Sequence, residues 1–217
     1  MSADLNILRK KQCLTMVGLM TGTSMDGLDI CVAEVEFGEK SATINVLETG
    51  SVPYNEKIRT DVEICLELDE KMIAETDDLL GRFMANETTR FLNRYGLNDI
   101  DAVAMHGQTV HHVSGESTLQ IGEPSFLAQV LDVPVISDFR TADITAGGTG
   151  APLIPIVDKW LFQRPEEAVV CLNLGGVANV TYLPPKTSDE FILGFDTGPG
   201  MALLDDCLLY TSDAADE

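Results

Sequence analysis

The sequence predicts a mixed α/β fold that begins with an antiparallel strand meander and continues with alternating strands and helices. Three observations indicate this class. Apolar, β-rich runs near the start are joined by short turns, a long segment then has helical periodicity, and short apolar strands afterwards alternate with helices. A length of 217 residues suits one large or two small domains.

The expected meander lies at the start of the chain. Apolar, β-rich runs cover residues 15–21 and 28–37 and are separated by the first glycine turn, residues 22–27. A third candidate strand covers residues 42–52, after a turn at 38–40. Successive strands with short connections pair antiparallel, so we expect these runs to form one meander.

Helical spacing follows the meander. Ile58, Val62 and Cys65 fall at positions i, i+4 and i+7. A longer apolar stripe then ends at Gly96, a residue that commonly closes a helix. The stripe consists of Ile73, Leu80, Phe83, Met84, Phe91 and Tyr95.

The middle of the chain alternates between strands and helices. We expect strands at 102–105 and 133–136, and helices at 126–131 and 153–162. A polar, glycine-rich loop is expected at 137–152. Such alternation is typical of strands that enter a parallel part of a sheet.

A second meander follows. Candidate strands at 169–174 and 177–183 flank the second glycine turn, Gly175-Gly176, and a further strand at 192–195 ends at Asp196. Because both halves open with a strand–glycine turn–strand unit, we predict a duplicated architecture. We place the first domain at residues 1–164, the start of the second at 165–206, and a separate tail at 207–217.

Composition excludes several classes of partner. There are 35 acidic and 14 basic residues, and the formal charge is −21, which argues against nucleic acid or an anionic membrane as the main partner. No apolar run approaches the roughly 20 residues that cross a bilayer. The five cysteines are scattered without a C-x-x-C motif, which indicates a reducing cytoplasm and neither disulfides nor a zinc site.

The first glycine turn offers successive backbone N–H groups and the hydroxyls of Thr23 and Ser24. Such a turn can bind phosphate oxygens, although a turn of this composition is more often only a turn. It is not a P-loop, since the Gly-Lys-Ser/Thr ending is missing. The second glycine turn offers backbone amides in the same way.

The three histidines, His106, His111 and His112, cluster with Gln108 after the strand at 102–105. Ligands of α/β proteins bind at the carboxyl ends of strands. Their spacing fits no common metal site, so we predict no protein metal site. Hydrogen bonding to a polar substrate and a structural loop both stay open.

The loop at 137–152 contains two carboxylates, Asp138 and Asp143, together with Arg140. A carboxylate without a basic partner could act as a general base. The alternative for Asp138 is that it caps a helix or pairs with Arg140.

Together these motifs resemble the anhydro-N-acetylmuramic acid kinases, bacterial enzymes of peptidoglycan recycling in the sugar kinase/Hsp70/actin superfamily. The resemblance covers about residues 16–205. It is carried by 18–29 (GLMTGTSMDGLD), 106–109 (HGQT), 121–124 (IGEP), 138–140 (DFR) with Asp143, 147–152 (GGTGAP), 173–179 (NLGGVAN) and 194–200 (GFDTGPG).

The resemblance implies an actin-like (ribonuclease H-like) ATPase fold, with the first domain complete and the second truncated. It also implies an ATP-dependent kinase that hydrolytically opens and phosphorylates 1,6-anhydro-N-acetylmuramic acid, giving N-acetylmuramic acid 6-phosphate. ATP and Mg²⁺ would be its cofactors and the amino sugar its small-molecule partner. A homodimer is a candidate assembly.

The resemblance also assigns roles to residues. Asp143 would be the catalytic base that activates water, and His106, Gln108 and Arg140 would lie near the sugar. The nucleotide phosphates would be bound by Gly22, Thr23, Ser24, Met25, Asp26, Gly27, Leu28, Asp29, Gly175 and Gly176.

Two departures from the family pattern bear on these expectations. The family continues into a larger second domain that supplies the adenosine pocket, so we expect this chain to be inactive alone. Back-translated, residues 207–217 match a transposase adapter used in sequencing libraries, so we exclude them from fold reasoning. The alternative function is a nucleotide-dependent interaction module of the same fold, but the sugar-facing polar motifs favour the kinase.

Overall fold

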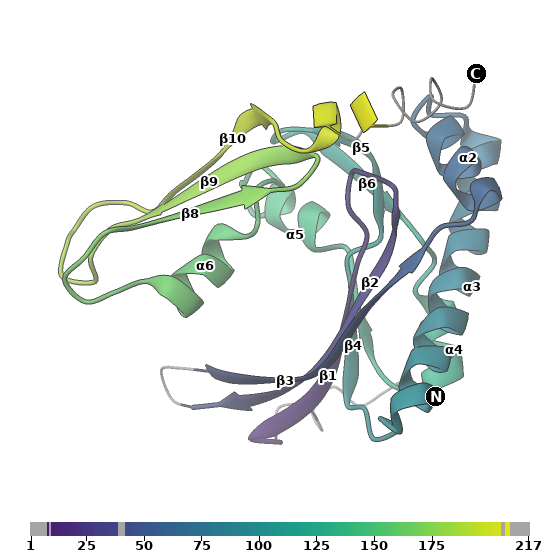
Figure 1. Ribbon diagram of the computed structural model, residues 1–217, viewed down its shortest axis with the longest axis horizontal. Helices are drawn as coiled ribbons and strands as arrows, with labels where there is room; N and C mark the ends of the chain where they lie inside the picture. Colours follow the sequence, from purple (N-terminus) through teal and green to yellow (C-terminus); the bar gives the residue numbers. More distant parts are fainter. Residues whose placement is uncertain (1–7, 9, 39–41, 205–206, 209–217) are drawn as a thin grey trace. The chain divides into compact units, whose positions relative to one another are not determined.

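The computed structural model describes residues 8, 10–38, 42–204 and 207–208 (Figure 1). Most of the turn expected at 38–40 and of the tail at 207–217 therefore lies outside the described residues. The chain divides into two compact units, Met1–Gly148 and Thr149–Glu217, which are described separately. The domain boundary near residue 165 stays a prediction.

The first unit contains a five-stranded mixed sheet of order β3-β2-β1-β4-β7. Strand β2 pairs antiparallel with β1 and β3, whereas β1, β4 and β7 run parallel. The predicted meander is therefore confirmed, and a sheet of this order with only β2 reversed is ribonuclease H-like. The strands are β1 (Cys13–Met20), β2 (Gly27–Phe37), β3 (Ala42–Pro53), β4 (Ala102–Met105) and β7 (Val135–Ile136).

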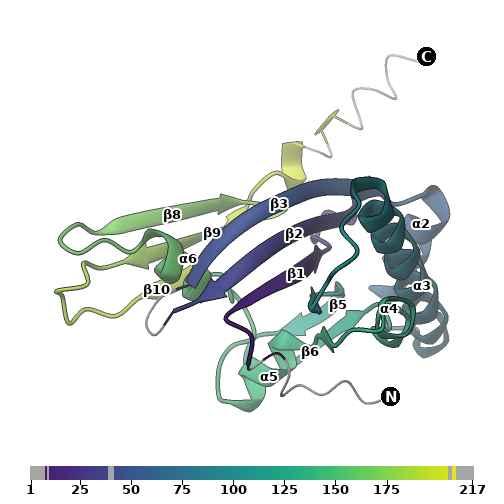
Figure 2. The same cartoon turned by 90° about the horizontal axis from the view of Figure 1, so that it is seen from below.

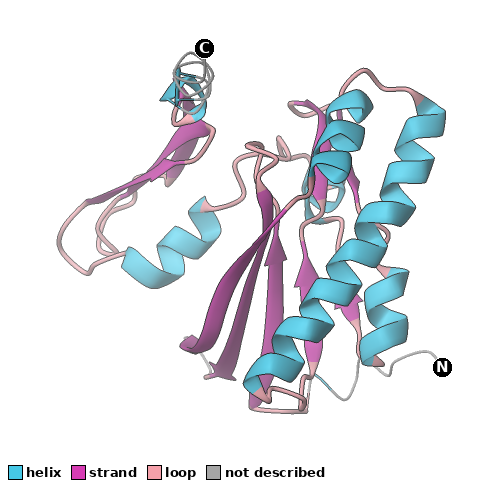
Figure 3. Ribbon diagram, turned by 45° about the vertical axis from the view of Figure 1, so that its right-hand side comes forward, coloured by secondary structure: helices cyan, strands magenta, loops and turns pink. Residues whose placement is uncertain are grey.

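Helices α2 (Glu56–Cys65), α3 (Glu70–Tyr95) and α4 (Ser125–Leu131) lie on one face of this sheet (Figure 3). The carboxamide oxygen of Asn55 caps α2 by accepting from the backbone N–H of Ile58. Gly96 closes α3 in the left-handed conformation, with φ at 69°. The helical periodicity of the sequence is thus confirmed.

The core of the first unit lies between the sheet and these helices. Apolar side chains of both layers are almost fully removed from solvent there, which is the main favourable contribution to folding. Members of this core include Val17, Leu28, Ile30, Val32, Ile58, Val62, Leu80, Met84 and Val103.

Two elements of the first unit differ from the sequence predictions (Figure 2). A hairpin of β5 (Gln108–Val113) and β6 (Ser117–Ile121) was not predicted. His111 and His112 therefore lie within a strand, β5, and not in a loop that follows β4. The expected loop at 137–152 contains α5 (Phe139–Thr145), which packs against β6.

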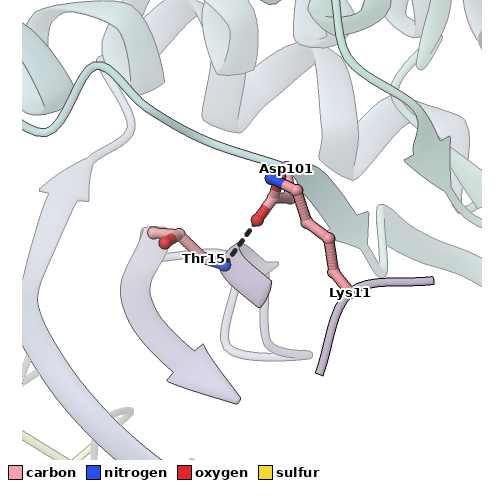
Figure 4. Close-up of polar contacts among 3 residues, drawn as sticks. All are labelled: Lys11, Thr15 and Asp101. Atoms are coloured by element: carbon pink, nitrogen blue, oxygen red, sulfur yellow. Dashed lines mark hydrogen bonds and ion pairs between the residues drawn. The ribbon is translucent and has the colours of Figure 1, made fainter. Parts of the chain in front are cut away.

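Asp101, just before β4, fixes the start of β1 (Figure 4). Its carboxylate accepts a hydrogen bond of 2.9 Å from the backbone N–H of Thr15 and also pairs with Lys11. The two contacts of Asp101 therefore join the starts of β1 and β4, at the end of the sheet opposite the first glycine turn.

The second unit contains an antiparallel sheet of order β10-β9-β8, and α6 packs against β9. The elements are α6 (Pro155–Phe162), β8 (Val169–Leu174), β9 (Val177–Leu183) and β10 (Leu193–Pro199). The predicted hairpin is confirmed. The predicted end of the last strand before Asp196 is wrong, because β10 continues to Pro199.

One face of this second sheet is apolar and exposed. Gly194 contacts Pro155 of α6 on the covered face, and its neighbours in β10 point to the other side. There, apolar side chains of β8 and β10 are 52–62% exposed, namely Val170, Leu172, Leu174, Leu193 and Phe195. In the described part of the chain, no helix is long and apolar enough to span a membrane.

Candidate functional site

The first glycine turn and the residues after β4 lie at the same edge of the sheet. Strands β1 and β4 are parallel neighbours, with Leu19 opposite Met105. The backbone N–H of His106 donates to the carbonyl oxygen of Leu19 at 3.0 Å. The first glycine turn and the polar side chains after β4 therefore meet at the carboxyl ends of two parallel strands, where ligands bind in α/β folds.

The first glycine turn is closed by the backbone N–H of Met25, which donates to the carbonyl oxygen of Gly22 at 3.2 Å. Met25 has a positive φ of 52°, whereas the glycines of this turn do not. Gly27 is required for another reason, since a Cβ there would overlap the carbonyl oxygen of Val52 on β3.

The residues predicted to bind phosphates differ in the solvent exposure of their side chains. The side chains of Thr23, Asp26 and Asp29 are exposed, and Asp29 accepts a hydrogen bond from Ser51. Leu28 is fully buried in the core, so only its backbone is left for a ligand. Phosphate binding by this turn stays a prediction.

Gln108 is fully buried at the start of β5. Its Nε2 donates to the carbonyl oxygen of Gly22 at 3.0 Å, and its Oε1 accepts from the hydroxyl of Tyr54 at 3.3 Å. Both ends of the carboxamide thus bind the protein. The predicted contact with a sugar stays a prediction, and the geometry favours a role in holding the turn.

Tyr54, which follows β3, was not among the predicted site residues. Its backbone N–H donates to the carbonyl oxygen of Asp26 at 2.9 Å. Its ring packs edge-on against Phe83, with 5.6 Å between centroids. Burial raises the pKa of Tyr54 well above its ordinary value, so its hydroxyl stays a donor to Gln108. No sequence pattern distinguishes this tyrosine.

His106 and Arg140 are brought together from β4 and α5. Arg140 donates from Nε to Nε2 of His106 at 2.9 Å, and Nδ1 of His106 lies 2.7 Å from the carbonyl oxygen of Gly107. An Nε2 that accepts leaves the ring proton on Nδ1, where it donates to Gly107. Burial, and secondarily the positive charge of Arg140, lower the pKa of His106 and favour this neutral ring.

The two carboxylates of α5 have different surroundings. Asp138 precedes the helix with φ at 61° and makes no capping hydrogen bond through its side chain, so of the two alternatives given for it the cap does not hold. The carboxylate of Asp143 lies against Gly148, where any Cβ would overlap it. Asp143 also has a polar or electrostatic partner, so the argument that it is an isolated base does not hold.

The second glycine turn is held through its carbonyl groups. The backbone N–H of Met201 donates to Gly175 at 2.8 Å, and that of Gly200 donates to Gly176 at 2.9 Å. Gly200 has no room for a side chain, because a Cβ would overlap the carbonyl oxygen of Gly175. Phosphate binding at Gly175 and Gly176 also stays a prediction.

A row of polar residues crosses the second sheet beside this turn. Asn179 of β9 lies opposite Asn173 of β8 and opposite Asp196 of β10. Directly opposed residues share a face of a sheet, so the three side chains lie in one row. Asp196 therefore lies within β10 beside Asn179 of β9, whereas the sequence predicted a strand that ends there.

Within the described ranges, His, Cys, Asp and Glu form no group of three or more that could hold a metal ion. A magnesium ion bound mainly through phosphates needs only one or two protein carboxylates. Asp26 and Asp29, which flank the end of the first glycine turn, are of that type.

The first unit is thus a ribonuclease H-like domain with a glycine turn at the end of β1. A family model described as anhydro-N-acetylmuramic acid kinase matches residues 14–215. The chain belongs to this family. The match also reaches into the tail at 207–217.

Curated relatives carry the same description. The anhydro-N-acetylmuramic acid kinase of Caldanaerobacter subterraneus subsp. tengcongensis is 36% identical over 93% of this chain and 54% of its own length. The protein of that name from Bacillus thuringiensis subsp. konkukian is 34% identical over 88% of this chain and 53% of its own length. The chain spans about half the length of these relatives.

A solved structure, YeaZ from Pseudomonas aeruginosa, is also similar. It is 11% identical, with a TM-score of 0.27, over 86% of this chain and 68% of its own. A TM-score this low indicates only a loose likeness.

Proposed function

We propose that this chain carries the phosphate-binding turn and part of the sugar site of an ATP-dependent anhydro-N-acetylmuramic acid kinase. The observation that supports it most is the match of the family model to residues 14–215. The edge of the sheet at β1 and β4 adds physical support, because it brings a glycine turn next to His106 and Arg140.

The first glycine turn is the proposed phosphate site. Its backbone N–H groups, with the hydroxyls of Thr23 and Ser24, suit phosphate oxygens. Bound ATP supplies the phosphoryl group, and Mg²⁺ offsets its negative charge. Asp26 and Asp29 are the carboxylates that we propose to lie nearest the metal, since both are exposed beside the turn.

The sugar site is proposed at His106 and Arg140. Nε2 of His106 accepts from Nε of Arg140, and the lowered pKa of His106 favours the neutral ring that can accept this bond. The hydrogen bond holds the guanidinium in one orientation. Arg140 is then suited to bind oxygen atoms of the sugar, because a guanidinium presents several donors in one plane.

The proposed reaction opens the anhydro bridge with water. The water oxygen bonds to the anomeric carbon while the bridging C–O bond breaks, and the freed sugar oxygen accepts the phosphoryl group as ADP leaves. The proton of the water goes to a carboxylate, which we propose to be Asp143 from the family resemblance. Asp138, which precedes α5 and makes no capping hydrogen bond through its side chain, is the alternative carboxylate.

The names of the relatives favour the kinase over an interaction module without sugar chemistry. A homodimer and a cytoplasmic location stay predictions.

The test uses an extended protein, in which this chain through Leu204 is continued by the remaining part of the Caldanaerobacter relative. It is incubated with Mg-ATP and 1,6-anhydro-N-acetylmuramic acid in ¹⁸O-labelled water. We expect one ADP per sugar, one phosphate on the sugar and one ¹⁸O at its anomeric carbon. Phosphorylated sugar without ¹⁸O would contradict the hydrolytic opening, and ATP hydrolysis without sugar phosphate would contradict the kinase.

A further inference from the structure

Gln108 contacts the first glycine turn from the interior of the protein, where its side chain is shielded from solvent. It is fully buried, and its Nε2 donates to the carbonyl oxygen of Gly22 at 3.0 Å. That oxygen also accepts the N–H of Met25, which closes the turn at 3.2 Å. The carbonyl of Gly22 is therefore held by two donors that point to it from different parts of the chain.

The direction of this carbonyl sets the direction of a neighbouring donor. A trans peptide is planar, so the C=O of Gly22 and the N–H of Thr23 point in opposite directions. Because the carbonyl points to the buried Gln108, the N–H of Thr23 points away from it, and Thr23 is exposed. The backbone donor is thus turned toward the side of the turn that a ligand can reach.

Tyr54 supports the same turn twice. Its hydroxyl donates to Oε1 of Gln108 at 3.3 Å. This hydrogen bond orients the carboxamide so that Nε2 faces Gly22. Its backbone N–H donates to the carbonyl oxygen of Asp26 at 2.9 Å, at the other end of the turn. Gln108 and Tyr54 therefore brace both ends.

We propose that Gln108, oriented by Tyr54, is a positioning residue that aims the N–H of Thr23 at a nucleotide phosphate. The inference rests on the proposed function, since it takes the turn as the phosphate site. It assigns Gln108 to the nucleotide side of the reaction in place of the sugar side. An amide fixed before the ligand arrives binds it more tightly than one that must first be ordered.

The first test is independent of any ligand. Hydrogen–deuterium exchange is measured by NMR at the N–H groups of Met25 and Tyr54 in the 217-residue chain. In Gln108→Met, we expect exchange at both positions to rise about tenfold, because the brace is lost. The matched control is Gln120→Met, since Gln120 lies on β6 and binds Thr109 and Thr118 instead of the turn.

The second test uses steady-state kinetics of the extended protein. We expect Gln108→Met to raise KM for Mg-ATP about tenfold, the loss of roughly one hydrogen bond to a charged group, with KM for the sugar within threefold of the unsubstituted value. Tyr54→Phe keeps the ring against Phe83 and removes only the hydroxyl, so a smaller change in the same direction is expected. If Gln108→Met fails to fold, Tyr54→Phe tests the proposal in its place.

The outcomes separate the inference from the proposed function. An unchanged KM for Mg-ATP with a raised KM for the sugar would overturn the inference and return Gln108 to the sugar. Unchanged exchange at Met25 and Tyr54 would overturn it as well. If the unsubstituted extended protein bound no Mg-ATP, while the exchange still responded to Gln108→Met, the proposed function would fall and the nucleotide role of Gln108 with it.

Discussion

Arg140 donates a hydrogen bond from Nε to Nε2 of His106 at 2.9 Å. The pair joins α5 to the end of β4, two segments 34 residues apart. The neutral ring of His106 can accept this bond, whereas a protonated ring could not. The orientation of Arg140 therefore depends on the protonation state of His106.

Replacing His106 should weaken sugar binding through Arg140. In the extended protein we expect His106→Phe to raise KM for the sugar about tenfold, because Nε of Arg140 loses its acceptor, while KM for Mg-ATP changes less than threefold. His106→Gln offers an acceptor again and should recover part of the loss. His111→Phe is the control, since His111 binds Ser117 of the same hairpin. Equal increases for His106→Phe and His111→Phe would refute the role of the pair.

The lowered pKa of His106 predicts a pH dependence of stability. The unfolded chain takes up this proton near pH 6.5, whereas the folded chain takes it up only at lower pH. The contribution of His106 is therefore fully present above pH 6.5 and is lost as the pH falls toward the folded pKa. The limiting slope is about 1.4 kcal/mol of unfolding free energy per pH unit. Urea unfolding between pH 7.5 and 5 should show a steeper loss in the unsubstituted chain than in His106→Gln, and parallel curves would count against this.

The two ends of the first glycine turn should respond differently to a side chain. At Gly22 the nearest atom to an added Cβ is Oγ of Ser24 at 3.2 Å, so Gly22→Val should fold and distort the turn locally. We expect it to raise KM for ATP about tenfold and to leave KM for the sugar nearly unchanged. At Gly27 the Cβ overlaps the backbone of β3, so Gly27→Ala should lower stability by about 1–3 kcal/mol. Equal effects of Gly22→Val on both substrates would indicate misfolding instead.

The catalytic carboxylate can be identified by comparing two variants. Asp143→Asn in the extended protein is expected to lower kcat by about 10²–10⁴ while ATP still binds, the usual contribution of a general base. Asp138→Asn is measured beside it, because Asp138 precedes the same helix and makes no capping hydrogen bond through its side chain. If Asp143→Asn stays within threefold of the unsubstituted kcat and Asp138→Asn loses activity, the base is Asp138.

The strands and helices with one apolar face could be predicted from the sequence. Strands β1 and β2 and helices α2 and α3 pack one side on the core, so their burial follows a period of two or of 3.6 residues. Helix α5 could not be predicted in this way, because it buries none of its residues. The β5–β6 hairpin was missed because its strands are mostly polar and half-buried.

The candidate site was predictable as a set of motifs but not as a set of contacts. The motifs around Gly22, His106 and Arg140 stand out as clusters of glycine and polar residues. Gln108 also stood out, yet its partners Gly22 and Tyr54 are 86 and 54 residues away and are set by strand pairing. Tyr54 carries no local signal, since its role arises only where β3 ends beside the turn.

We propose that these residues are one part of a sugar kinase and that activity needs the remaining part, because the chain spans about half the length of the curated relatives it matches. On the apolar face of the second sheet, Val170, Leu172 and Leu174 are 58–62% exposed. Burial of apolar surface contributes about 25 cal/mol per Å² to stability, so the exposure of this face would lower the stability of the chain alone.

The most direct measurement is the rate of ATP-dependent phosphorylation of 1,6-anhydro-N-acetylmuramic acid by three proteins. They are the 217-residue chain, a form that ends at Arg164, and the extended protein. We predict activity in the extended protein and none above background in the other two, because near-attack geometry requires all of the groups that position the substrates. Activity of the 217-residue chain comparable to that of the extended protein, or an inactive extended protein that is folded, would contradict this proposal.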